Sequence, residues 1–108
     1  MQLQLPISWS YWMEKRAGRR YQRLLDRHRE IQRGGLSITA YVVKAYAGKV
    51  MDCNTRLIHL KLRINILDEN HVLLISKCLF PANQVAPERR SLSIKFLPAD
   101  LSQVVILS

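Results

Sequence analysis

The segment from Thr55 to Leu67 constrains the fold more than any other part of this sequence, because most of its residues alternate between apolar and polar side chains. The apolar positions are Ile58, Leu60, Leu62, Ile64 and Ile66, and the polar positions between them are His59, Lys61, Arg63 and Asn65. Successive side chains of a strand point to opposite faces of a sheet. The pattern therefore predicts one long strand with an apolar face and a basic, solvated face.

Four other segments carry strand signals. Residues 38–47 are rich in β-branched and aromatic types, and residues 71–80 follow the polar turn Asp68-Glu69-Asn70, which predicts a hairpin with the long strand. Residues 92–96 alternate again, and residues 103–107 form a short apolar run. Proline-containing segments, 81–90 and 97–100, separate these last strands.

The N-terminal part of the chain has a different periodicity. Residues from about Ser10 to Arg33 contain no proline and consist mainly of good helix formers. Mainly apolar residues recur three or four positions apart, as on one face of a helix; this stripe comprises Met13, Ala17, Tyr21, either Leu24 or Leu25, His28 and Ile31. Gly34 is predicted to end the helix. A short edge strand from Leu3 to Ile7 is predicted before it.

These elements predict an α+β domain that is mainly β, with a basic helical segment at residues 1–34 and a small barrel domain at residues 35–108. An open sheet of five short antiparallel strands would expose two edges, and closure into a barrel removes them. We expect a five-stranded antiparallel OB-like β-barrel with one N-terminal amphipathic helix covering an edge or an open end. The predicted core consists of Val42, Ile58, Leu60, Leu62, Ile64, Leu74, Ile94 and Phe96.

The sequence offers little chemistry. Its acidic residues and histidines fall in predicted turns, on the helix surface or on separate elements, and no nucleophile, metal-ligand or phosphate-loop motif surrounds them. Cys53 and Cys78 lack a CxxC spacing and are predicted to be reduced structural thiols. We therefore expect no enzyme activity, no metal and no cofactor.

The start of the chain lacks the features of a secretory signal. No window approaches the roughly 18 apolar residues that a membrane-spanning helix requires. The expected location is the cytoplasm or the inner face of a bacterial membrane.

The basic helix is the sharpest functional feature. The net charge of +9 favours an acidic partner. The helix carries the arginines Arg16, Arg19, Arg20, Arg23 and Arg27, with Trp9 and Trp12 near its start. Such a face can be simply solvated, or it can bind anionic lipid, nucleic acid or an acidic protein surface.

The polar face of the long strand is the second candidate surface, with His59, Lys61 and Arg63. OB-folds bind single strands on such a face, but they need aromatic side chains for stacking. The long strand has none, so Tyr41 or Tyr46 would have to supply them. This absence counts against a single-strand binder.

Several features after Gly35 occur in a fixed order: Ala40-Tyr41-Val42, the long hairpin, Pro87, the segment 96–100 and the terminal strand 104–107. In this order the chain resembles the β domain of uncharacterised bacterial membrane-associated proteins grouped as domain-of-unknown-function family 3592. The resemblance implies a small β-barrel without known catalysis, often near a membrane, and transfers no functional residues.

Together these observations predict a non-enzymatic interaction or assembly module that binds a protein or a membrane-associated complex through its basic helix. The alternative is an OB-like nucleic-acid-binding domain. Packing of the Met13–Ile31 stripe on the barrel would indicate a structural helix, whereas projection of the stripe would indicate a binding element.

Overall fold

The computed structural model describes the backbone of residues 7–66 and 70–107 and the side chains of residues 18–65 and 72–107. Helix α1 (Ile7–Gly34) precedes the strands β1 (Leu36–Val50), β2 (Thr55–Ile66), β3 (Asn70–Pro81), β4 (Arg90–Leu97) and β5 (Asp100–Leu107). The predicted helix and all five predicted strands are therefore present, most of them somewhat longer than expected. Ile7 begins the helix, while the rest of the predicted edge strand lies outside the described residues, as do turn residues Asp68 and Glu69.

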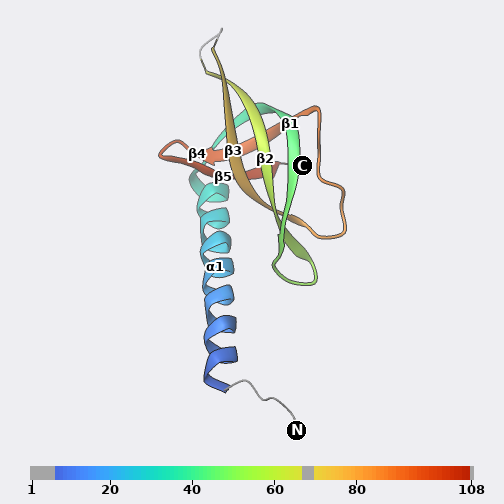
Figure 1. Ribbon diagram of the computed structural model, residues 1–108. Helices are drawn as coiled ribbons and strands as arrows, with labels where there is room; N and C mark the ends of the chain where they lie inside the picture. The colour runs from blue at the N-terminus through green and yellow to red at the C-terminus, as the bar shows by residue number, and fades with distance from the viewer. Residues whose placement is uncertain (1–6, 67–69, 108) are drawn as a thin grey trace.

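The sheet closes on itself in the order β1-β2-β3-β5-β4 (Figure 1). Strand β1 takes part in two pairings, since its first half lies beside β4 and its second half beside β2. The prediction of a wholly antiparallel sheet is wrong at one seam, where β3 and β5 are parallel at Lys77 and Gln103. A ring with an odd number of strands cannot alternate in direction all the way round, so one neighbouring pair must be parallel.

The core lies inside this ring and contains the side chains that alternation predicted. Ile58, Leu60 and Leu62 of β2 are fully buried, together with Val42 of β1 and Ile94 of β4. Leu74 and Phe96 are partly buried and pack against this cluster. Ser76 of β3, a fully buried polar residue, donates a 2.6 Å hydrogen bond from its hydroxyl to the Leu101 carbonyl across the parallel seam. This bond satisfies a group whose burial would otherwise be unfavourable.

The C-terminal half of α1 packs on the sheet, and the backbone of its N-terminal half extends beyond it. In the C-terminal half of α1, Ile31 is fully buried, and the Gln103 side chain of β5 donates a 2.9 Å hydrogen bond to the Leu24 carbonyl. Lys95 of β4 donates in the same way to the Gln32 carbonyl at 3.0 Å. The N-terminal half extends past the lower end of the ring (Figure 1). The side chains of Met13 and Ala17 lie outside the described residues.

One extra residue in β1 changes which side chains share a face. Tyr41 and Val42 pair with Arg63 and Leu62, but the next pair is Lys44 with Lys61, so Val43 has no partner on β2. Such a β-bulge shifts the alternation by one residue. The segment before β4 holds it in place, because Arg89 N–H donates to the Val42 carbonyl at 2.7 Å and the Glu88 carboxylate accepts from Ala45 N–H at 2.9 Å.

Replacing Leu62 by alanine should destabilise the fold by about 2–5 kcal/mol, because the change removes buried methyl groups and leaves a cavity. Lys61→Ala, one residue away on the opposite face, should change the free energy of unfolding by less than about 0.5 kcal/mol. Urea denaturation of both variants measures the difference. Equal destabilisation would contradict an inward-facing Leu62 and an outward-facing Lys61.

Candidate functional site

Three rows of side chains cross the outer face of β1, β2 and β3. The register aligns Tyr46 with His59 and Lys77, Lys44 with Lys61 and Ile75, and Tyr41 with Arg63 and Leu73. We call these nine residues the outer platform. Residues two apart on a strand are separated by roughly 7 Å, so the rows form a regular ladder of cationic, aromatic and aliphatic groups.

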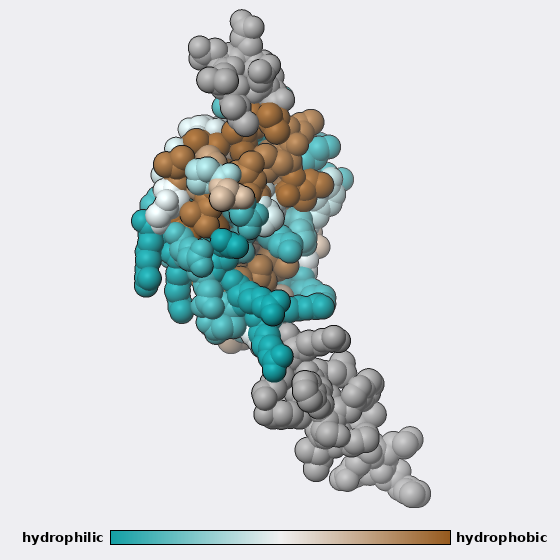
Figure 2. Space-filling view, turned by 90° about the vertical axis from the view of Figure 1, so that its left-hand side faces the viewer, coloured by the Kyte–Doolittle hydropathy of each residue, from teal (hydrophilic) through white to brown (hydrophobic). Residues whose placement is uncertain are grey.

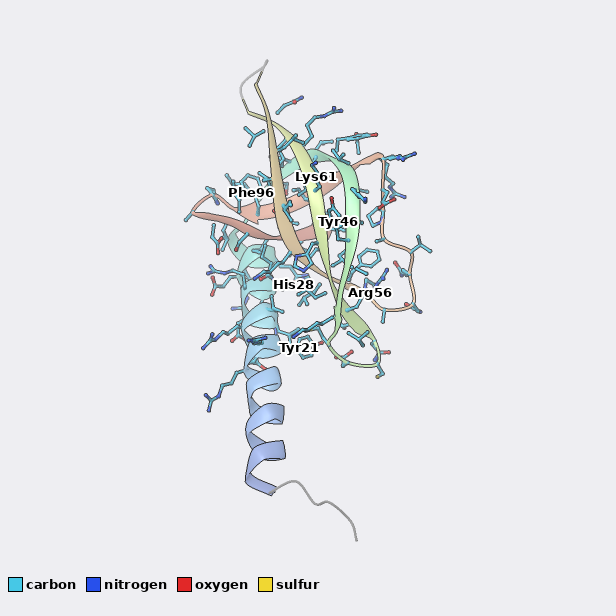
Figure 3. The ribbon with its side chains drawn as sticks, in the orientation of Figure 1. Tyr21, His28, Tyr46, Arg56, Lys61 and Phe96 are labelled. Carbon is cyan, nitrogen blue, oxygen red and sulfur yellow. The ribbon has the colours of Figure 1, made fainter. Side chains whose placement is uncertain are left out.

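The aromatic side chains that the long strand lacks come from β1. The Arg63 guanidinium carbon lies 4.7 Å from the centre of the Tyr41 ring, and Lys44 Nζ lies 5.2 Å from the centre of the Tyr46 ring. Both distances are typical of cation–π contacts. The Tyr46 side chain is 40% exposed, so its ring remains accessible beside Lys61 of the neighbouring strand (Figure 3). The folded sheet therefore places two aromatic rings on the same face as the cations of β2.

Aliphatic side chains make the platform unlike an ordinary solvated face. Leu73 and Ile75 of β3 are 58% and 61% exposed, next to Arg63 and Lys61 of β2. Apolar surface gathers toward the β2–β3 hairpin tip, while hydrophilic side chains gather over the described part of α1 (Figure 2). A ligand with both apolar faces and negative charge would match this combination.

A second feature is a groove between α1 and the sheet, with a volume of about 940 Å³. Its walls carry the cationic residues Arg20, Arg23, Arg27, Lys49 and Lys77 and the acidic residues Asp26, Glu30 and Asp100. His59 also lines it. We call this the helix groove. Because His59 and Lys77 belong to both features, the groove continues directly into the platform.

The acidic residues of the groove are engaged within the protein. Arg27 lies 3.4 Å from the Asp100 carboxylate and 3.3 Å from that of Glu30, and Asp26 accepts a 2.8 Å hydrogen bond from Gln22. Hydrogen bonds from Ser102, and to a smaller extent the charge of Arg27, lower the pKa of Asp100. Among the described side chains, no ion pair engages Arg20 or Arg23.

A hydrogen bond attaches α1 to the β1–β2 loop beside the groove. The Tyr21 hydroxyl donates a 2.6 Å hydrogen bond to the Asp52 carboxylate, and Figure 3 shows Tyr21 directed toward that loop. The same carboxylate accepts the N–H groups of Asn54 and Thr55 at 2.7 and 2.8 Å. These bonds stabilise the charged carboxylate, which lowers the pKa of Asp52 and raises the pKa of Tyr21.

The structure brings together part of both predicted surfaces. Arg20, Arg23 and Arg27 of the helix face His59 of the sheet across the groove, whereas Lys61 and Arg63 lie farther along the platform. Arg19 is exposed and does not line the groove. The side chains of Trp9, Trp12 and Arg16 lie outside the described residues.

Sequence reasoning missed that Tyr41 and Tyr46 share a face. They are five residues apart, an odd spacing that places side chains on opposite faces of a regular strand. The extra residue at Val43 reverses that expectation. No periodicity in the sequence signals the bulge, although Glu88 and Arg89, which hold it, stand in a predicted loop.

Other chemistry is sparse in the described part of the chain. There, no group of three or more histidine, cysteine, aspartate or glutamate side chains is arranged to hold a metal ion. Cys53 is exposed and Cys78 is buried, both as free thiols, and burial raises the pKa of Cys78 to about 12. No helical stretch among the residues searched combines the length and hydropathy needed to cross a bilayer.

No protein-family profile, curated protein or solved structure matches this chain. The resemblance to a membrane-associated β domain therefore stays a prediction. Function has to be inferred from the geometry and charge of the site itself.

His28 generates a pH prediction. It is partly buried between α1 and the sheet, its Nδ1 has no hydrogen-bond partner among the described residues, and burial, with the nearby Arg29 charge, lowers its pKa. A base with a lowered pKa in the folded state resists protonation there, so its contribution to stability is complete above about pH 6.5 and is lost as the pH falls.

The melting temperature of the native chain should therefore decrease between about pH 7.5 and 5.5 more steeply than that of His28→Leu, which cannot be protonated. Calorimetry across this range tests the difference. Parallel curves for the two proteins would mean that His28 binds protons equally well in the folded and unfolded states.

Proposed function

We propose that this protein is an OB-like domain that binds single-stranded nucleic acid on the outer platform. The observation that carries the proposal is the alignment of Tyr41 and Tyr46 beside the cations of β2 on one exposed face. Stacking on aromatic rings and phosphate contacts to arginine and lysine are the two interactions on which single-strand binders depend.

The topology supports this proposal by analogy. A five-stranded barrel that binds oligonucleotides on the face of strands 2 and 3, between the loops joining strands 1–2 and 4–5, is the OB arrangement. In this chain the platform lies on β1–β3, and the helix groove reaches Met51 after β1 and Asp100 at the start of β5. Fold-level likeness alone does not establish a function, so the weight rests on the residues of the face.

The chemistry of the platform implies binding with little sequence preference. Tyrosine rings stack with any base, and the guanidinium of Arg63 can contact a phosphate while it remains near Tyr41. Leu73 and Ile75 add apolar surface for base faces.

The second candidate function is binding of a protein or membrane-associated complex through α1. The observation that favours it is the projection of the N-terminal half of the helix beyond the ring (Figure 1). Arginine and tryptophan are common hot spots at protein interfaces, and both anchor helices at anionic membrane surfaces. This candidate predicts loss of the partner when Arg16, Arg19, Arg20 and Arg23 are all replaced by glutamine, with the platform intact.

Titration of fluorescently labelled single-stranded and duplex oligonucleotides, each as DNA and RNA, tests the nucleic-acid proposal. Tyr46→Leu should weaken single-strand binding roughly 5- to 150-fold, because one stacked base contributes about 1–3 kcal/mol. Tyr46→Phe keeps the ring and should bind like the native chain.

Binding should also decrease with salt, with a slope of about −0.7 per phosphate contact in a plot of log affinity against log salt. No detectable binding at low salt, or equal losses for the leucine and phenylalanine variants, would contradict the proposal. Tighter binding to duplex than to single strands would also count against it.

A further inference from the structure

We infer that the helix groove is a second subsite for the same ligand, which holds the phosphates of a single strand where the strand leaves the outer platform. This inference rests on the proposed function. It assigns α1 a role in binding rather than only in packing, and it makes affinity depend on ligand length.

Continuity of the two surfaces is the first step. His59 and Lys77 stand in the last row of the platform and also line the groove. The outer platform is therefore continuous with the groove that the arginines of α1 line. A strand stacked on Tyr46 next to His59 would have the groove as the adjacent surface.

The second step concerns which charged side chains of the groove are already paired within the protein. Its carboxylates are occupied: Asp100 and Glu30 by Arg27, and Asp26 by Gln22 and, at 4.0 Å, by Arg29. Arg20, Arg23, Lys49 and Lys77 line the same groove, and no described carboxylate lies within ion-pair distance of them. The free charge offered to a ligand is therefore positive, although the groove contains acidic residues.

The third step is the kind of contact that the groove can make. Apart from His59, its lining has no aromatic side chain, in contrast to the platform. Stacking of bases would therefore end at the platform, and the groove would contact the backbone of the ligand. Arginine suits this role because its planar fork matches phosphate oxygens.

Fixed geometry is the fourth step. The hydrogen bonds from Tyr21 to Asp52, from Gln103 to the Leu24 carbonyl and from Lys95 to the Gln32 carbonyl hold α1 at three points along its length. Arg20 and Arg23 flank the first of these points. Their backbone positions are therefore set before any ligand binds, which lowers the entropy lost on binding.

The experiment compares two double variants that remove the same charge from the same helix. Arg20→Gln/Arg23→Gln changes the groove, whereas Arg19→Gln/Arg33→Gln changes exposed arginines that do not line it and that form no ion pair with a described carboxylate. Each is titrated with single strands of about 5 and about 15 nucleotides, near the two limits of the site size of one OB fold. Circular dichroism and the melting temperature verify that both variants are folded.

With the long strand, the groove variant should bind more weakly than the control variant, and its salt slope should be shallower by about 1.4 if two phosphate contacts are lost. With the short strand, which fits on the platform, the two variants should bind alike. DNA and RNA strands should give the same pattern, since the contacts are to phosphate.

Equal behaviour of the two double variants at both lengths, with the native chain still binding, would overturn the inference and leave the proposed function intact. Failure of the native chain to bind either strand would instead overturn the proposed function. Sedimentation with anionic but not neutral vesicles, lost in the groove variant while long-strand binding is unchanged, would assign the groove to a lipid surface and also overturn the inference.

Discussion

Burial of alternate aliphatic side chains inside a closed sheet is the interaction on which the rest of this structure depends. Ile58, Leu60 and Leu62 of β2 are removed completely from solvent, so the residues between them have to face outward. The outer face of β2 is thus basic because the intervening positions are histidine, lysine and arginine. Burial of the apolar positions therefore determines which face of β2 carries the charged side chains.

Periodicity was enough to predict α1, the strands β2 and β4 and the buried side chains of β2, because these features repeat at a fixed interval along the chain. Residue types and turns, rather than periodicity, predicted β1, β3 and β5. The presence of one parallel pair could have been deduced from the odd number of strands once closure was assumed, but its location between β3 and β5 could not. The bulge at Val43 and the helix groove could not, since they depend on hydrogen bonds between distant residues, such as Glu88 with Ala45 and Gln103 with Leu24. The sequence alone therefore presents the two basic surfaces as alternatives, whereas the folded chain brings part of each together in the helix groove.

The distribution of charge also follows from the fold. Described carboxylates at the helix–sheet junction are used for internal contacts: Asp52 binds Tyr21 and two backbone amides, and Asp100 lies beside Arg27. Arg20 and Arg23 of α1 and Lys49 and Lys77 of the sheet have no described carboxylate within ion-pair distance, so both walls of the groove carry cations without such a partner. The net charge of +9 alone does not define a binding surface, because evenly spread charge attracts a polyanion without orienting it, whereas grouped cations can orient it.

The bulge in β1 makes the second half of that strand unusually sensitive to chain length. Beyond Val43, Lys44 and Tyr46 face outward and Ala45 packs against the core, solely because one residue is left without a partner. Loss of that residue would turn this half-strand over, carrying a lysine and a tyrosine into the interior and an alanine to the surface. Insertions and deletions are thus far less tolerable at this point than most single substitutions, and the length of β1 is as strong a constraint on the platform as the identity of its side chains.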